Sequence, residues 1–326
     1  MKVFYSDRFV LPLPEGHRFP MAKYRMLRER VEAAGICDEG DLREPRALTD
    51  EELLLVHTEG YIESLVSGSI TDKEARRIGF PWSPEMVERC RRTCGGTLGG
   101  ALAAMEEARS VGWGVAVNLA GGTHHAFSHR GEGFCVFNDS ALAARLLQRN
   151  GHAERVVVID TDVHQGNGTA AILEGDSSVF TFSIHGAKNF PFNKERSDLD
   201  IPLDDGTGDG EYLKSLAWGL DKSLSAIDAD AAIFLAGADP FEGDRLGRMS
   251  VTRKGLAKRD RMVLDALKER AIPTVVTMAG GYAREVSTTV DIHFETVRYA
   301  ASLHNRLNIR ELNIRDQNSI EGEIQR

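Results

Sequence analysis

Residues 155–168 of the chain read RVVVIDTDVHQGNG, a short apolar run that ends in two carboxylates and an imidazole. Its first part, Arg155–Asp160, shows no alternation of apolar and polar residues, which is typical of a strand buried on both faces of a parallel sheet. Similar runs recur along the chain. Together they predict strands at Lys2–Tyr5, Trp113–Leu119, Arg155–Asp160, Val179–Ile184, Ala231–Leu235 and Pro273–Met278.

The longer segments between these runs have helical periodicity. Ser83 and Pro84 favour a helix start, because the hydroxyl can cap the helix and proline is tolerated at its first position. The alternation of strands and helices predicts an α/β fold with a central, mostly parallel sheet flanked by helices. The predicted helices are Met21–Ala34, Pro84–Ala108, Ser140–Arg149, Glu211–Ala226, Arg253–Glu269 and Arg284–Leu303.

The composition of the 326 residues restricts the class of protein. The chain has 40 Lys and Arg against 49 Asp and Glu, a formal net charge of −9, which disfavours a nucleic-acid-binding protein. Four cysteines are too few for a disulfide scaffold. The sequence shows neither a signal peptide nor a run of about 20 apolar residues that would span a membrane. We therefore expect a cytoplasmic protein with no membrane span.

The domain organisation follows from what the sequence lacks. It contains no internal repeat and no linker rich in proline or serine, so one domain is expected. We predict a single catalytic domain over residues 1–305 and a polar C-terminal tail over residues 306–326.

Polar residues follow four of the predicted strands at their carboxyl ends. In an open parallel sheet, ligands bind just outside this edge, so these residues are expected to form one site. The segments concerned contain His124 and His125, Asp160 to His164, Asp239, and Tyr282 after Gly280 and Gly281.

The residue types at this edge predict a metal site. In an extended chain Asp160, Asp162 and His164 share one face, where two carboxylates and an imidazole are unfavourable unless a cation binds them. With Asp239, the set Asp162, His164 and Asp239 offers three ligands and leaves a position for water, as catalytic zinc requires. A helix cap and a hydrogen-bonded core histidine would explain each residue alone, but they explain the set poorly.

Three further side chains can supply acid–base chemistry. Histidines titrate near neutrality, so His124 and His125 can act as general acid or base beside a metal. The hydroxyl of Tyr282 can polarise a carbonyl and stabilise an oxyanion. Taken alone, the two histidines would be a solvated pair in a glycine-rich loop, and the tyrosine an aromatic residue at a sheet edge.

Several of these segments, in this order, resemble the zinc-dependent histone deacetylases of the arginase/deacetylase fold. They are residues 121–127 (GGTHHAF), 133–139 (GFCVFND), 160–168 (DTDVHQGNG), 237–239 (GAD) and 280–282 (GGY). The sequence HQGNG at 164–168, with EGDRLG at 242–247, is most similar to that of the class IV branch and its bacterial relatives. The resemblance covers roughly residues 1–300.

The resemblance implies a role for each matching residue. Asp162, His164 and Asp239 would bind one zinc ion per chain. His125 would be the general base and acid, with His124 as its electrostatic partner, and Tyr282 would stabilise the oxyanion. Asp160 would pair with His124 and Asn167 with His125. The acyl-lysine tunnel would be lined by Gly133, Phe134, Phe192 and Gly280. A monovalent cation, usually potassium, would lie at Asp160, Asp162, His164, Ser183 and Ile184.

Asn167 departs from the pattern of many family members, which have a second aspartate at this position. An amide can orient His125 but cannot stabilise its protonated form as a carboxylate does. We therefore expect a lower pKa for His125 than it would have beside an aspartate.

Several functions remain open from the sequence. The leading prediction is a zinc amidohydrolase that removes acyl groups from N-acyl-lysine or a related acyl amine, with an acetylpolyamine amidohydrolase as an alternative. A binuclear manganese ureohydrolase would need a motif such as Asp-x-His-x-Asp, whereas the order here is Asp160, Asp162, His164. A non-catalytic acyl-lysine binding module would not need Tyr282 or both histidines. The charge of −9 would suit a cationic substrate.

Overall fold

The computed structural model describes residues 1–38 and 40–304, so the predicted tail over 306–326 lies outside the described residues. Its centre is an eight-stranded sheet in which every pair of neighbouring strands is parallel, in the order β2-β1-β3-β8-β7-β4-β5-β6. The strands are β1 (Val3–Phe4), β2 (Leu42–Arg43), β3 (Val115–Asn118), β4 (Val156–Asp160), β5 (Val179–Gly186), β6 (Leu199–Leu203), β7 (Ala231–Leu235) and β8 (Thr274–Thr277).

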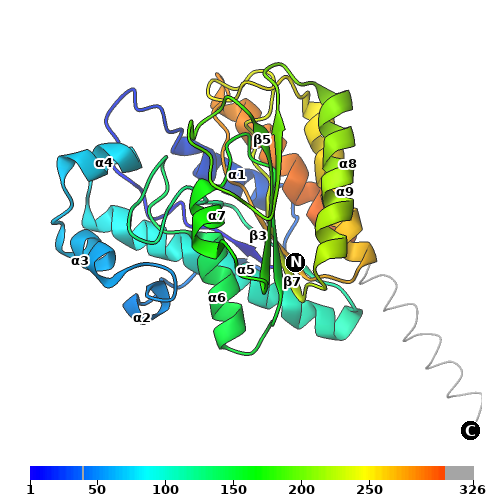
Figure 1. Cartoon of the computed structure of the whole chain (residues 1–326), viewed down its shortest axis with the longest axis horizontal. Helices are drawn as coiled ribbons and strands as arrows, with labels where there is room; N and C mark the ends of the chain where they lie inside the picture. The colour runs from blue at the N-terminus through cyan, green and yellow to red at the C-terminus, as the bar shows by residue number, and fades with distance from the viewer. Residues whose placement is uncertain (39, 305–326) are drawn as a thin grey trace, which may run out of the picture.

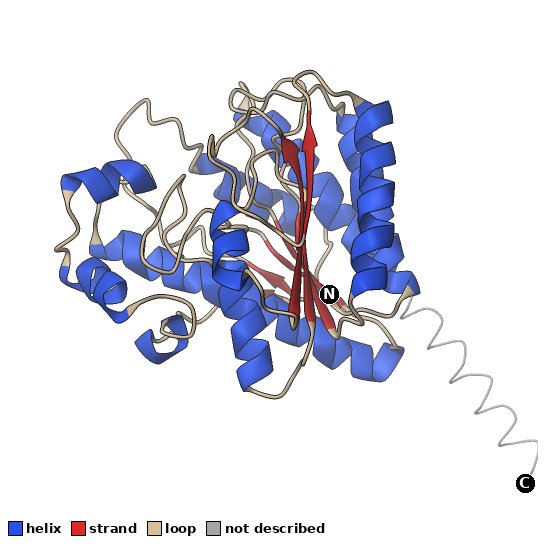
Figure 2. Ribbon diagram, in the orientation of Figure 1, coloured by secondary structure: helices blue, strands red, loops and turns tan. Residues whose placement is uncertain are grey.

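Helices cover both faces of this sheet, as Figures 1 and 2 show. The chain is helical again at residues 286–304. The named helices are α1 (Ala22–Ala33), α2 (Asp50–Leu53), α3 (Glu59–Ser67), α4 (Asp72–Ile78), α5 (Pro84–Val111), α6 (Asp139–Arg149), α7 (Asn167–Leu173), α8 (Asp209–Ala226) and α9 (Arg253–Glu269). The α/β fold with a parallel sheet flanked by helices is therefore confirmed.

The position of β4 between two cores explains why its sequence does not alternate between apolar and polar residues. Val157 and Ile159 pack into the core beneath α1, α8 and α9, whereas Val156 and Val158 pack into the core beneath α5 and α6. Both faces of the strand are thus dry, and each requires apolar side chains. At the start of α5, the Ser83 hydroxyl accepts a hydrogen bond from the Met86 amide at 3.1 Å, as the sequence predicts.

The order of the strands in the sheet determines where the candidate site lies. The four strands followed by polar residues in the sequence, β3, β8, β7 and β4, are consecutive neighbours at the centre of the sheet. Their registers align Asp160 with Leu235 and Leu235 with Thr277, so the segments that follow them leave the sheet together. The Ala238 amide donates to the Gly280 carbonyl at 2.9 Å, which joins two of these segments directly.

Candidate active site

The segment after β4 is shaped by its own aspartates. The strand ends at Asp160, so the prediction that Asp162 and His164 continue an extended strand is wrong, and both lie in a loop. The Asp162 amide donates to Asp160 Oδ1 at 3.1 Å, and the His164 amide donates to Asp162 Oδ1 at 2.9 Å. These hydrogen bonds, in which a backbone amide donates to the carboxylate two residues before it, hold the loop at the carboxyl end of the strand.

The side chains of Asp162, His164 and Asp239 converge at this loop. One ligand atom from each lies within 4.8 Å of the others, and all three residues are buried. His164 Nδ1 is 2.9 Å from Asp162 Oδ1 and 3.2 Å from Asp239 Oδ2. The other carboxylate oxygens are fixed by amides, because Val163 donates to Asp239 Oδ1 at 2.9 Å and Gly280 donates to Asp162 Oδ2 at 2.7 Å.

The electrostatics of this group fit a bound cation. Asp239 Oδ2 is fully buried and accepts no hydrogen bond from the described residues. Burial, and next the neighbouring Asp162 carboxylate, raise the pKa of Asp239 to about 7. A divalent cation would remove both penalties, and the set of two oxygens and one nitrogen suits zinc with one position left for water.

Gly280 lies against the same two carboxylates. A Cβ atom at this position would collide with Asp239 Oδ2 and would lie 2.6 Å from Asp162 Oδ2. The residue that the sequence analysis placed in the tunnel therefore contributes the space in which the metal ligands meet.

We expect Gly280→Ala to lower zinc affinity by about 10- to 100-fold, the range found when a group that orients metal ligands is disturbed. Zinc competition with a fluorescent chelator measures this. The matched control is Gly210→Ala, where a Cβ meets nothing within 4 Å. Unchanged affinity in Gly280→Ala would show that this glycine does not shape the ligand set.

His124 and His125 lie beside the metal ligands with different partners. The His124 Nδ1–H donates to Asp160 Oδ2 at 2.6 Å, and the His125 Nδ1–H donates to Asn167 Oδ1 at 2.7 Å. Burial opposes protonation of His124, but the Asp160 and Asp162 carboxylates outweigh it and raise its pKa to about 9. Burial, and next the charges of His124 and His164, lower the pKa of His125 well below its ordinary value. His124 is thus suited to remain a cation, and His125 to act as a neutral base through Nε2.

The loops that carry these residues are held by aspartates with no role assigned from the sequence. Asp139, at the start of α6, accepts from the amides of Gly122 at 2.9 Å and Thr123 at 2.7 Å, just before the histidine pair. Asp244 accepts from the Tyr282 amide at 2.6 Å. Both lie in the segments that resemble the family, at 133–139 and 242–247, but no spacing in the sequence indicates which loop each one holds.

Lys23 in α1 was not singled out in the sequence either. Its side chain is buried, and Nζ donates to the Ala279 carbonyl at 3.2 Å and lies 5.5 Å from the ring of Tyr282. A lysine in a polar stretch more than 250 residues away gives no sequence signal of this contact.

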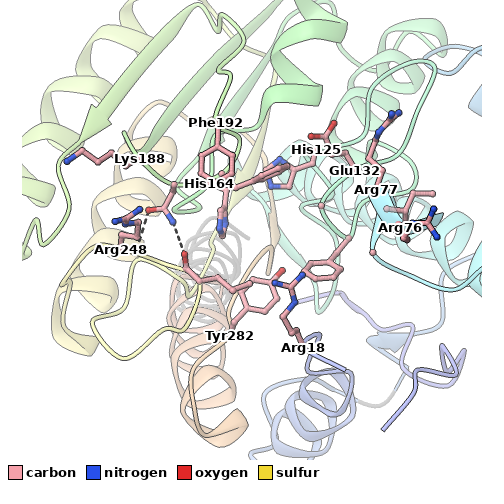
Figure 3. Close-up of a pocket in the computed structure, with 17 residues that line it drawn as sticks. Arg18, Arg76, Arg77, His125, Glu132, His164, Lys188, Phe192, Arg248 and Tyr282 are labelled. Carbon is pink, nitrogen blue, oxygen red and sulfur yellow. Dashed lines mark hydrogen bonds between the residues drawn. The ribbon is translucent and has the colours of Figure 1, made fainter. Parts of the chain in front are cut away.

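A cavity of about 580 Å³ leads to these groups and is lined by His125, His164 and Tyr282 (Figure 3). Gly133 and Phe134 line it as the resemblance implies, and Phe134 has a left-handed backbone, φ 67°. Phe192 also lines it, but with 85 % of its surface exposed. The aromatic contact to His125 comes from Phe190, at 4.9 Å between ring centroids, which the sequence analysis did not single out.

Comparison with known proteins adds family evidence to this geometry. The model of the histone deacetylase domain matches residues 17–297. The chain belongs to the histone deacetylase family. As a member of it, the chain is a deacetylase, a hydrolase that removes acetyl groups.

Relatives from bacteria and plants agree with this membership. An uncharacterised protein of Picosynechococcus is 42 % identical over 89 % of this chain and 95 % of its own length. Histone deacetylase 2 of Arabidopsis thaliana is 28 % identical over 94 % and 81 %, and the acetoin utilization protein AcuC of Bacillus subtilis is 31 % identical over 73 % and 65 %.

Solved structures confirm the fold of the family. The histone deacetylase homologue from Aquifex aeolicus has a TM-score of 0.78 at 24 % identity and covers 92 % of this chain and 84 % of its own. A histone deacetylase homologue complexed with SAHA gives a TM-score of 0.79, with 93 % and 84 % covered. Among the helices of residues 1–38 and 40–304, none combines the length and apolar character needed to cross a membrane.

Proposed function

We propose that this deacetylase is a zinc-dependent amidohydrolase that removes acyl groups from N-acyl-lysine or a closely related acyl amine. The observation that carries the proposal is the buried Oδ2 of Asp239, which accepts no hydrogen bond from the described residues and lies 3.2 Å from His164 Nδ1. It lies beside a cavity lined by His125 and Tyr282. One zinc ion would be held by Asp162, His164 and Asp239.

When bound, zinc supplies a Lewis acid that lowers the pKa of water and polarises an amide carbonyl. His125 takes a proton from the attacking water at Nε2, because its Nδ1–H is committed to Asn167. It then gives this proton to the leaving amine. His124, held as a cation by Asp160, disfavours a second positive charge on His125. Tyr282 lines the same cavity, and its hydroxyl donates a hydrogen bond to the oxyanion as that charge develops.

Asn167 gives this mechanism a pH dependence that can be tested. Activity falls on the acid side of the profile when His125 becomes protonated. In Asn167→Asp a carboxylate 2.7 Å from Nδ1 would stabilise the imidazolium, so the pKa of His125 rises. We expect the acidic limb of the kcat/KM profile to move to higher pH by about one unit. An acidic limb that stays in place would mean that it does not report His125.

Other readings of the site have less support. Among the described residues, a single group of three metal-ligating side chains is found, whereas a binuclear ureohydrolase needs ligands for two ions. Asp160 does not add to this set, because its Oδ2 accepts from His124. A non-catalytic binding module would have no use for a neutral base and an oxyanion donor in the same cavity.

Two finer assignments are part of the proposal. A potassium ion would lie beside β4 and β5, where Asp160 and Ser183 are register partners. The HQGNG spelling at 164–168 supports a class IV-like enzyme. The cytoplasmic location, the lack of nucleic-acid binding and the single domain over residues 1–305 remain predictions from the sequence.

The proposal is tested with acyl-lysine peptides that carry acetyl, medium-chain or long-chain acyl groups, with acetylated polyamines beside them. We expect release of free lysine amine and free acid in equal amounts, with many turnovers per enzyme. Binding of these peptides without any product would favour the binding module instead.

A further inference from the structure

The mouth of the cavity carries a charge opposite to that of the whole chain. Five cationic side chains line it, against the single carboxylate of Glu132. The chain as a whole has a formal net charge of −9, so this excess of positive charge is local. The five are Arg18, Arg76, Arg77, Lys188 and Arg248, called the basic rim below.

Four of the five side chains of the basic rim form no ion pair with the residues that the structure describes. Arg18, Arg76, Arg77 and Lys188 are exposed and form no ion pair within residues 1–38 and 40–304. Arg248 pairs with Asp205 at 3.0 Å. The one acidic residue of the lining, Glu132, is 3.3 Å from Arg130, which further reduces its effect on the cavity. The rim therefore presents free positive charge to a ligand.

Helix stabilisation explains only part of this arrangement. Arg76 and Arg77 lie in the last turn of α4, where cations stabilise the helix dipole. Arg18, Lys188 and Arg248 lie outside helices, in three loops far apart in the sequence. Figure 3 shows Lys188 and Arg248 on one side of the pocket, Arg76 and Arg77 on the other, and Arg18 beside Tyr282. Local helix stabilisation therefore does not account for all five residues, whereas all five line the same cavity.

We propose that the basic rim selects acyl-lysine substrates that carry acidic residues on both sides of the modified lysine. The inference rests on the proposed function and deepens it by naming the substrate class. Cations on opposite sides of the mouth match carboxylates spread along a peptide better than one compact anion such as a phosphate. Positive charge at the mouth also disfavours acetylated polyamines and lysine-rich tails, so the cationic substrate suggested by the net charge is not the one that this site fits.

Three peptides with one central acetyl-lysine test the proposal, with two Glu, two Gln or two Lys residues on each side. For the wild-type enzyme we expect kcat/KM to be about tenfold or more higher for the Glu peptide than for the Lys peptide at low ionic strength. The difference should shrink as salt is added, because the rim charges are exposed and screened.

The variants Arg18→Gln, Lys188→Gln and the double variant Arg76→Gln/Arg77→Gln attribute this preference to the rim. Each removed cation should lower the Glu-to-Lys ratio of kcat/KM by about two- to fivefold, mainly through KM. The matched control is Arg109→Gln. Arg109 is exposed in the last turn of α5, just before the amino end of β3, whereas the cavity lies at the carboxyl ends of the strands. Its ratio should equal that of the wild type.

The outcomes separate this inference from the proposed function. If no peptide of the three is hydrolysed, the proposed function fails. If the Gln peptide is hydrolysed but the Glu and Lys peptides are cleaved equally well, the function stands and the selection by the basic rim is wrong. A preference for the Lys peptide or for acetylated polyamines would also overturn it.

Discussion

Replacing Asp239 by asparagine is expected to lower kcat/KM by about 10³-fold or more, since a bound metal contributes several kcal/mol to the stabilisation of the transition state. Asp239 Oδ2 is the buried ligand atom with no hydrogen-bond donor among the described residues, and an amide at this position binds zinc weakly. Zinc content by elemental analysis and turnover of an acetyl-lysine peptide are measured on the same preparation, and both should fall.

Thermal unfolding provides the control for this variant. A ligand that binds only the folded state stabilises it, so zinc should raise the Tm of the metal-free wild type and leave that of Asp239→Asn nearly unchanged. A variant that keeps one zinc per chain and normal turnover would remove Asp239 from the ligand set.

Replacing His125 by alanine is expected to lower kcat by about 10³-fold while zinc stays bound. General acid–base catalysis contributes on the order of 10²- to 10⁴-fold, and His125 is the histidine whose pKa is held low by burial and by His124 and His164. It is not one of the three residues that converge on the metal position. In His125→Ala, therefore, turnover should fall while the zinc content stays the same, whereas both should fall in Asp239→Asn.

His152→Ala serves as the matched control, because His152 is exposed in the turn after α6. We expect it to retain wild-type turnover. Near-normal kcat in His125→Ala would assign the proton transfers to another group, and loss of zinc in that variant would make His125 part of the metal site.

The fold was predictable because the central strands are buried on both faces. Val156 to Ile159 supply both cores of the molecule, so the apolar run in the sequence reports the position of the strand directly. The edge strands β2 and β6 were not predicted. Leu42–Arg43 has only two residues, and Leu199–Leu203 contains an aspartate and a proline, which are uncommon inside strands.

The metal-binding part of the site was predictable because carboxylates and an imidazole at neighbouring strand ends are typical metal ligands. Asp162, His164 and Asp239 were grouped from the strand ends alone, and the structure brings them together. Which phenylalanine contacts His125 was not predictable, because Phe190 and Phe192 are two residues apart in one loop and only its conformation decides between them. The resemblance favoured Phe192, which is 85 % exposed at the mouth.

The charge of the cavity mouth was beyond the sequence for a different reason. Arg18, Arg76, Arg77, Lys188 and Arg248 come from four separate segments, and each looks like an ordinary solvated residue in its own stretch. The net charge of −9 pointed to the opposite substrate. A sum over the whole chain carries no information about where the charges lie, and only the fold places these cations together.

The most direct test of the account is a titration of the chelated, metal-free enzyme with zinc, followed by hydrolysis of an acetyl-lysine peptide. We predict no hydrolysis without metal and full recovery of kcat/KM at one zinc per chain, because one group of three ligands is found in the described residues. Full activity in the metal-free enzyme, or recovery only with two manganese ions per chain, would contradict the account.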